Sequence, residues 1–361
     1  MNERNASLDF LRFAAAMIVA VPHLIIFFRL SDHAVDLEIM TSMGVEVFFA
    51  LSGFVLAPLI FRIVTTHDPV YENTRVFFIR RWMRTLPLFF FSAVLHFVIF
   101  DPDWNLHAFS YFLFLQNFAW SAPSYDYFSV SWSLAIEEWF YVVLPLYLIA
   151  CRRYIHKNRP LNENKVFIYT AAFVLVFIGL KAVYPSTGEE WGAELRRVTV
   201  FRLDAIAFGG LTYLLVQRRS VLVNPAVLAI SLPLQAWLVY LLYVRILSGE
   251  ATHFEANVLV FILSATFSCA LVAFAHVADR WMPAVSQPAS LWGGRISYGI
   301  YLFHIPIGVM ITIVPADLLP GGSWQVVVAV LALWIFTAAI YQVFERPILI
   351  NRPIYVGRDL G

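Results

Sequence analysis

Ten long apolar segments limit what this chain can fold into. The 361 residues are 60% hydrophobic and only 14% charged, whereas a soluble globular domain is about 45–50% apolar and about 25% charged. Runs of about 20 apolar residues cross a bilayer as helices, which satisfy their backbone polar groups internally. The sequence therefore predicts an all-α integral membrane protein, a bundle of about ten transmembrane helices in one domain over residues 1–361. The predicted spans lie near residues 8–28, 43–61, 85–100, 130–150, 165–184, 198–216, 225–244, 257–278, 296–314 and 324–344.

The basic residues orient these spans. With the N-terminus in the cytoplasm, most of the 25 Lys and Arg residues fall in inner segments, as the positive-inside rule expects. We therefore expect both termini to be cytoplasmic, in the cell (inner) membrane, and the first apolar run to remain as an uncleaved helix. The aromatic stretch from His107 to Trp120 is short for a span, which favours a re-entrant or interfacial segment over an eleventh helix.

Composition argues against several other classes of protein. No clustered basic face stands apart from membrane topology, so nucleic acid is not expected as a partner. Cys151 and Cys269 lie in or beside apolar segments, and two such cysteines provide neither a disulfide framework nor a metal site. We expect no metal and no permanently bound cofactor, and the sequence contains no HExxH, P-loop, GxSxG or CxxC motif.

Two polar residues share one side of the first span. Arg12 and His23 are separated by three helical turns, with a residual rotation of about 20°, and by roughly 16 Å along the axis. Ionisable groups inside a bilayer are costly and usually face a functional interior. Two ordinary explanations remain open, namely that Arg12 extends to the cytoplasmic head groups and that His23 makes a helix-packing hydrogen bond. Pro22 frees a backbone carbonyl and opens room beside His23.

The fourth span carries a polar stripe. Ser133, Glu137 and Tyr141 are spaced by four residues and share one face. Glu138 points about 100° away, so Glu137 is the better candidate for the bundle interior, and Glu138 remains the alternative. We expect Glu137 at a depth similar to that of His23, where a carboxylate bonded to one ring nitrogen orients the imidazole and raises its basicity.

Arg81 and Arg84 share a face on the cytoplasmic approach to the third span. Arginines are common at this place in any membrane protein, but guanidinium groups also match phosphate oxygens. With Arg12 they form a predicted cytoplasmic layer, while His23 and Glu137 form a deeper layer in the outer half. Such layers suit a donor with a phosphate-rich head and a long arm, such as acyl-coenzyme A, with His23 as general base on an acceptor hydroxyl.

Further candidates for the substrate site accompany these residues. Trp132 adjoins the polar stripe of the fourth span, and the ninth span contributes Tyr298 and His304. Tyr298 and its neighbour Tyr301 also fit an ordinary aromatic belt near the inner interface. His304 is more typical of a structural than of a catalytic histidine.

Six motifs occur in an order that resembles the acyltransferase-3 family of integral-membrane acyltransferases. They are Arg12-x10-His23, Phe48-Phe49-Ala50-Leu51-Ser52-Gly53-Phe54, Arg81-x-x-Arg84 with Pro87, Trp132-Ser133-Leu134-x-x-Glu137-Glu138-x-Phe140-Tyr141, Ser297-Tyr298-x-x-Tyr301-Leu302-x-His304 and Glu345-Arg346-Pro347. The resemblance implies a ten-helix domain that transfers an acetyl or related acyl group from acyl-coenzyme A to a carbohydrate. It also implies that His23 and Arg12 are essential and that Arg81 and Arg84 handle the donor.

This chain departs from the family pattern in two respects. Glu46 stands where the family usually has Asp or Asn, so it is given no role. Some members carry an extracytoplasmic esterase-like domain, whereas here we expect the membrane domain to complete transfer alone or with a separate partner. Two further intramembrane charges, Arg202 and Asp204, do not face each other on one helix, so each is expected to find a partner elsewhere.

The sequence favours an O-acyltransferase of the membrane that uses acetyl-coenzyme A as co-substrate. Its expected partners are acyl-coenzyme A, membrane lipids and a carbohydrate or glycolipid acceptor of the cell envelope, whose identity the outer loops do not disclose. Buried His, Arg and Glu residues also build proton relays, so a secondary transporter or flippase is the alternative, although no inverted repeat is visible. A third hypothesis is a component of a polysaccharide export complex without chemistry of its own.

Overall fold

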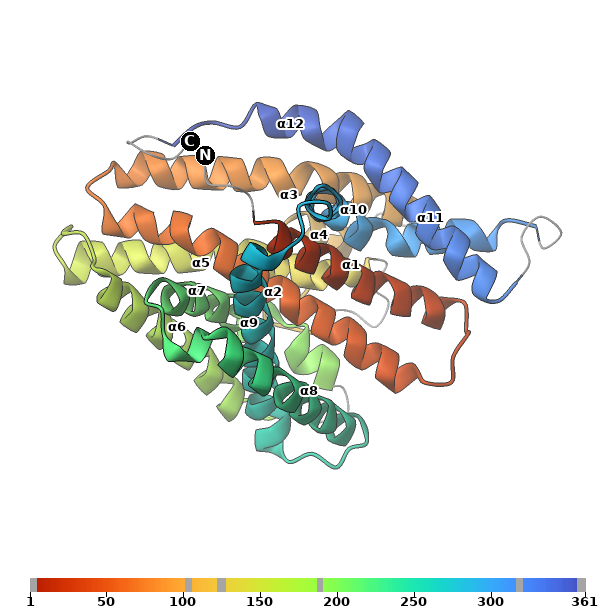
Figure 1. Cartoon of the computed structure of the whole chain (residues 1–361), viewed down its shortest axis with the longest axis horizontal. Coiled ribbons are helices and arrows are strands. Elements are labelled where there is room, and N and C mark those ends of the chain that lie inside the picture. The colour runs from red at the N-terminus through yellow and green to blue at the C-terminus, as the bar shows by residue number, and fades with distance from the viewer. Residues whose placement is uncertain (1–4, 101–105, 122–127, 187–190, 316–320, 356–361) are drawn as a thin grey trace.

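The computed structural model describes residues 5–100, 106–121, 128–186, 191–315 and 321–355, and these residues form helices and no strand (Figure 1). The prediction of an all-α multi-pass membrane protein is confirmed. The helices are α1 (Ala6–Phe27), α2 (Ala34–Thr65), α3 (Val70–Phe100), α4 (Leu106–Phe112), α5 (Trp132–Ala150), α6 (Glu163–Val183), α7 (Leu203–Gln217), α8 (Pro225–Leu247), α9 (Val260–Ala278), α10 (Gln287–Thr312), α11 (Ser323–Ile340) and α12 (Arg346–Ile350).

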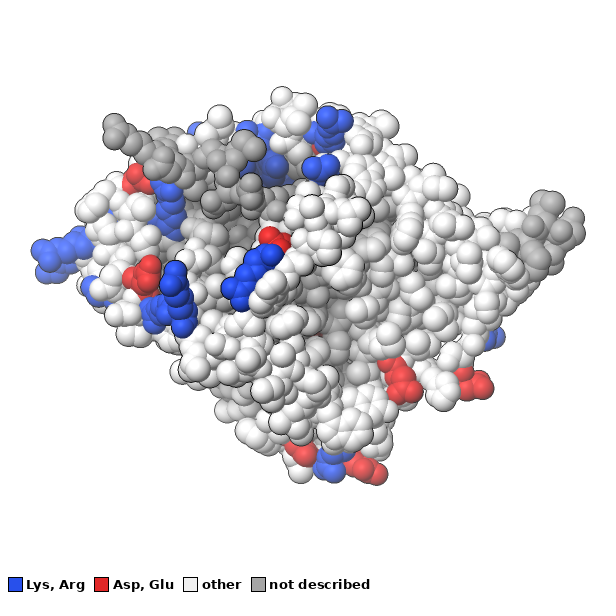
Figure 2. Space-filling view, viewed as in Figure 1, with Lys and Arg blue, Asp and Glu red and all other residues white. Residues whose placement is uncertain are grey.

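Within the described residues, nine helical segments are long and apolar enough to cross a membrane. The tenth predicted span, near residues 296–314, lies on α10, which has 26 residues but includes Arg295 and several small polar side chains. α1 and α11 pack against α10 and cover much of its surface. A helix covered by other helices needs fewer apolar side chains than one that faces lipid. On the face in Figure 2, most blue side chains lie at the left and top, red ones lie among them at the left and along the lower right edge, and most of the right half is uncharged.

α3 begins much earlier than the sequence predicted. It starts at Val70 rather than near residue 85, because residues 70–84 contain neither Gly nor Pro to interrupt it. Arg81 and Arg84 therefore lie inside a helix, more than two turns from its start, and not on a segment that leads into it.

The segment after α3 turns back into the bundle. α4 has seven residues, about 10 Å of helix, which is too short to cross a bilayer. Asn117 and Phe128 are buried, and the Phe128 ring centroid lies 5.4 Å from that of Phe89 and 4.1 Å from that of His96. In the described part of this segment α4 is too short for an eleventh span, and the residues that lead into α5, Val130 and Ser131, are buried.

Close backbone contact joins α2 to α7. A Cβ atom on Gly53 would overlap the backbone carbonyl of Ile206, and one on Gly209 would overlap that of Ala50. Only glycine lets the two helices approach so closely, as small residues do in other membrane bundles.

Two buried ion pairs tie α2, α6 and α7 together. Arg202, just before α7, pairs with Glu46 of α2, and Lys181 of α6 lies 2.5 Å from Asp204 of α7. All four side chains are nearly inaccessible, and buried charges of this kind require a partner. The expectation that Arg202 and Asp204 find separate partners is confirmed, and Glu46 is one of them.

Candidate active site

α1 and α10 form the axis of the site. A Cβ atom on Gly294 would lie 2.5 Å from Asp9 Oδ1, and one on Gly308 would lie 2.9 Å from Leu24 Cδ2. Because residue numbers rise together along this contact, the two helices are parallel. Their small residues allow close packing, and this packing turns the Arg12–His23 stripe of α1 toward the polar residues of α10.

His23 contacts a histidine of α10. His23 Nδ1 lies 2.9 Å from His304 Nε2. The ring planes differ by 1° and the ring centroids are 5.1 Å apart, which fits a hydrogen bond within a common plane rather than face-to-face stacking. His304 Nδ1 lies 2.8 Å from the backbone carbonyl oxygen of Tyr301.

These contacts fix the positions of the protons. A carbonyl oxygen only accepts hydrogen bonds, so the Nδ1 atom of His304 carries a hydrogen and the Nε2 atom of the neutral ring has a lone pair. That Nε2 atom accepts the hydrogen bond that His23 Nδ1 donates. The lone pair of His23 is therefore on Nε2, and an oriented imidazole with a free lone pair is what general-base catalysis requires.

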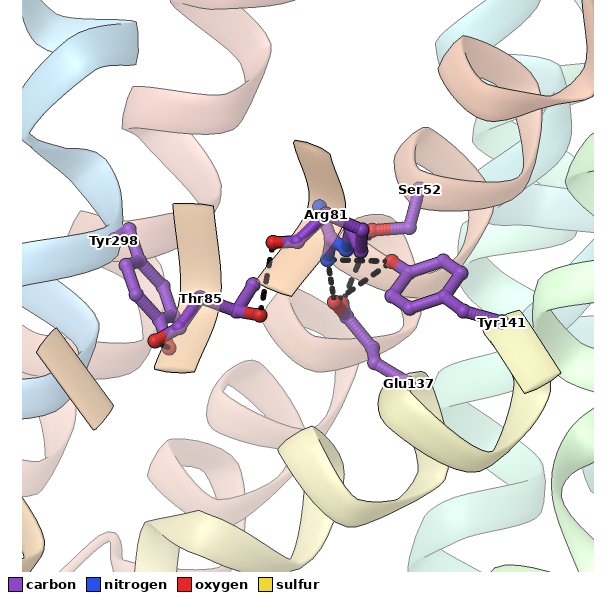
Figure 3. A network of polar contacts seen from close by, with 6 residues as sticks. All are labelled: Ser52, Arg81, Thr85, Glu137, Tyr141 and Tyr298. Atoms are coloured by element: carbon purple, nitrogen blue, oxygen red, sulfur yellow. Dashed lines mark hydrogen bonds and ion pairs between the residues drawn. The ribbon is translucent and has the colours of Figure 1, made fainter. Parts of the chain in front are cut away.

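Glu137 belongs to a different network (Figure 3). It accepts hydrogen bonds from Arg81 Nη2 at 2.9 Å, the Tyr141 hydroxyl at 2.9 Å and the Ser52 hydroxyl at 3.0 Å. The Arg81 guanidinium also lies 4.0 Å from the centroid of the Tyr141 ring. The prediction that Glu137 shares a layer with His23 is wrong: it lies with Arg81.

The depth of α5 explains this difference. Val130 and Ser131, just before α5, are buried, so the helix starts within the bundle instead of at the outer surface. Glu137 lies just over one turn into α5 and meets α3 at Arg81. Glu138 is buried and Glu137 is half-buried, and Glu137 is the one that lines the cavity described next.

Most of the predicted residues surround one cavity of about 370 Å³, here called the central cavity. Arg12, Arg81, Arg84, Ser133, Glu137 and Tyr298 line it. Arg12 also lies 3.1 Å from Asp9, so it faces this interior and is paired there. Tyr298 donates a hydrogen bond to the carbonyl oxygen of Thr85 at 3.0 Å, and Figure 3 shows its ring beside Thr85.

A second cavity of about 310 Å³ contains His23 and is here called the His23 cavity. Trp132 lines it, together with Glu38, Arg196 and Arg197. The Arg196 guanidinium lies 5.2 Å from the Trp132 ring centroid and 3.9 Å from Glu38.

Sequence analysis missed Arg196 and Arg197 as candidates. One signal was present, because two adjacent arginines in a predicted outer segment run against the positive-inside rule. Tyr141 and His304 do not line either cavity among the described residues, but they hold Glu137 and His23, which do.

Val45 and Tyr301 line both cavities and form the partition between them. The Tyr301 hydroxyl donates to the carbonyl oxygen of Val130 at 2.9 Å and lies 2.6 Å from the Ser133 hydroxyl. Tyr301 is buried, so it is not the interfacial belt residue that the sequence left open. A molecule in one cavity and a molecule in the other would meet at this side chain.

Comparisons with known proteins agree with this architecture. A family model described as an acyltransferase domain, Acyl_transf_3, matches residues 5–342. The chain is 28% identical over 335 residues to the putative peptidoglycan O-acetyltransferase YrhL of Bacillus subtilis, covering 85% of this chain and 50% of that protein. It is 26% identical over 335 residues to the peptidoglycan O-acetyltransferase OatA of Listeria monocytogenes, covering 86% of this chain and 51% of that protein.

The O-acetyltransferase OatA of Staphylococcus aureus is 25% identical over 295 residues, which cover 74% of this chain and 46% of that protein. The chain thus spans about half the length of these curated relatives. No solved structure matches it. Because the family model covers nearly the whole chain, this multi-pass membrane protein belongs to the Acyl_transf_3 family of acyltransferases.

Proposed function

We propose that the chain transfers an acetyl or related acyl group from cytoplasmic acyl-coenzyme A to a hydroxyl of a cell-envelope or exported carbohydrate. The observation that carries this proposal is the pair of cavities that meet at Val45 and Tyr301, one lined by arginines and the other by His23. The names of the relatives support a carbohydrate acceptor. We further propose one domain in the cytoplasmic membrane, with both termini in the cytoplasm.

In this mechanism the acceptor hydroxyl occupies the His23 cavity and the donor thioester lies at the partition. His23 Nε2 removes the hydroxyl proton as the oxygen attacks the thioester carbonyl carbon. The carbon–oxygen bond forms, the carbon–sulfur bond breaks, and the proton on His23 passes to the departing thiolate. The products are the acylated acceptor and free coenzyme A, so His23 returns to its starting state.

His304 acts through His23. Its hydrogen bond keeps the lone pair of His23 on Nε2 and fixes the ring, as the partners of metal-bound and catalytic histidines do. We assign Arg12, Arg81 and Glu137 to positioning: Arg81 and Glu137 neutralise each other and hold α3 against α5 beside the donor path. Of the predicted Arg81–Arg84 phosphate clamp, we assign Arg84, which lines the central cavity, to contact with the donor.

The test is coenzyme A release by purified protein in nanodiscs, with acetyl-coenzyme A and an envelope glycan fraction as acceptor. We expect His23→Ala to lower the rate by about 10²–10⁴-fold, the usual contribution of a general base. His96→Ala is the matched control, because His96 is also a helix histidine but lies against Phe128 and is not among the described residues that line either cavity. Undiminished release by His23→Ala would refute the assignment of the base. In proteoliposomes, movement of a sugar across the bilayer without consumption of the thioester would favour the transporter.

A further inference from the structure

A third cavity, of about 410 Å³, lies at the end of the bundle where α10 begins. Four arginines line it: Arg84 of α3, Arg295 of α10, Arg346 of α12 and Arg352 of the segment that follows. We call this cavity the arginine basin. Sequence analysis considered only Arg84 for ligand binding, because the other three are distributed over distant parts of the chain and come together through folding alone.

The positive charge of the basin exceeds its negative charge. Glu345 lines the basin and interacts electrostatically with Arg84, which leaves three guanidinium groups in excess. Arg346 donates a hydrogen bond to the neutral side chain of Gln342 and Arg352 donates to the backbone carbonyl of Leu349. Burial, together with the charges of Arg84 and Arg80, lowers the pKa of Arg352, which indicates that these cations destabilise one another. A bound anion would relieve that repulsion.

The segment that follows α12 is held against α3. Arg80 donates a hydrogen bond of 2.7 Å to the carbonyl oxygen of Pro353, and its guanidinium lies 5.2 Å from the ring centroid of Tyr355. Tyr355 is itself buried against the bundle. Arg352 lies between α12 and these contacts, which restrict its position. The arginine basin is therefore stabilised by packing of the C-terminal segment.

The basin opens toward the site of transfer. Arg84 and Arg352 line both the basin and the central cavity, so the two spaces adjoin. Along α10, Arg295 precedes Tyr301 by about 9 Å and His304 by about 14 Å of helix. A ligand with an anionic head in the basin and a narrow arm in the central cavity would therefore extend toward the partition.

We propose that the arginine basin binds the phosphate groups of the acyl donor, with Arg295, Arg346 and Arg352 joining Arg84 as their ligands. Guanidinium groups bind phosphate oxygens through paired, charge-assisted hydrogen bonds. The inference rests on the proposed function for the identity of the donor. An anionic lipid head group offers the same phosphate chemistry, and the experiment distinguishes the two sources.

The first measurement compares acetyl-coenzyme A with S-acetylpantetheine, which keeps the thioester arm but has no phosphate. The variants are Arg295→Gln, Arg346→Gln and Arg352→Gln, in nanodiscs of neutral phosphatidylcholine. We expect each to raise KM for acetyl-coenzyme A about tenfold, equivalent to about 1.4 kcal/mol, with kcat/KM for S-acetylpantetheine unchanged. Arg153→Gln, an exposed arginine outside the basin, is the matched control and should change neither. Equal effects on both donors, or no effect on acetyl-coenzyme A, would overturn the proposal.

The second measurement is independent of catalysis. Titration calorimetry of the wild-type protein with adenosine 3′,5′-bisphosphate should give saturable binding that each of the three substitutions weakens and Arg153→Gln does not. If this pattern appears without any acyl transfer, the basin stands and the proposed function fails. If transfer occurs but the nucleotide binds all variants equally, the proposal for the basin fails. Loss of nucleotide binding on adding phosphatidylglycerol would assign the basin to lipid and overturn it.

Discussion

Replacing His304 tests whether the orientation of His23, rather than its presence alone, supports catalysis. His304→Ala removes the acceptor for the His23 Nδ1 hydrogen, so the imidazole can adopt the other tautomer and turn. His304 is completely buried, and losing the partner of a buried hydrogen bond costs about 1–3 kcal/mol. If that cost falls on the transition state, kcat falls about 5- to 150-fold. KM for acetyl-coenzyme A should not change, because the arginine basin lies about 14 Å along α10 from His304.

Two further variants separate this effect from a loss of folding. In His304→Gln, the side-chain oxygen keeps an acceptor near the His23 Nδ1 position, so we expect a smaller loss of kcat than in the alanine variant. His96→Gln is the matched control and should change melting temperature without changing kcat. The assay is coenzyme A release in nanodiscs, with kcat and KM determined separately. An unchanged kcat in His304→Ala, or a change confined to KM, would refute the orienting role of His304.

Three other predictions concern the cavities and the packing around them. Arg81→Gln leaves the half-buried Glu137 without its cation and should destabilise the fold by about 1–3 kcal/mol, measured as a lower melting temperature. The paired change Arg81→Met with Glu137→Leu should recover much of that stability but no activity. Val45→Phe enlarges the side chain at the partition and should lower kcat about 100-fold by separating the reacting groups, whereas Val45→Ala should retain acyl transfer. Equal kcat values for the two variants would contradict the proposal that donor and acceptor meet at this partition. Gly53→Ala places a methyl group against the backbone of α7 and should cost about 1–3 kcal/mol of stability, whereas Gly179→Ala, with open space around it, should be neutral in the same thermal melt.

Sequence reasoning predicted the helices better than their ends. Nine described helical segments are long and apolar enough to cross a membrane, whereas the predicted span near residues 296–314 lies on the less apolar α10. The four-residue spacing on α5 put Ser133 and Glu137 on one side of the helix, and both line the central cavity. Sequence reasoning grouped Glu137 with His23 instead of with Arg81, because the position of α5 against α3 depends on packing such as that of Phe128 on Phe89 and His96. No periodicity within one helix carries that information.

The partners of the site residues were also beyond single-helix patterns. His23 and His304 are joined by a contact between segments separated by 281 residues, and it depends on glycines that let α1 and α10 approach. The arginine run of α3 could be identified as cationic, but its three members make different contacts. Arg80 binds the C-terminal segment, Arg81 pairs with Glu137, and Arg84 lines the central cavity and the arginine basin. The helices that surround α3 determine these contacts.

The parallel contact of α1 with α10 also determines when the site can exist during synthesis. At about 5–20 residues per second, the 281 residues between His23 and His304 take roughly 14–56 s to translate. Arg12 has a carboxylate on its own helix throughout, since Asp9 lies one turn away. The imidazole of His23 has no polar partner on its own helix and stays without its hydrogen-bond partner until α10 has been synthesised and inserted. A ribosome that stops after α9 would therefore leave a membrane protein with an unmatched polar group, which is a recognisable mark for quality-control proteases.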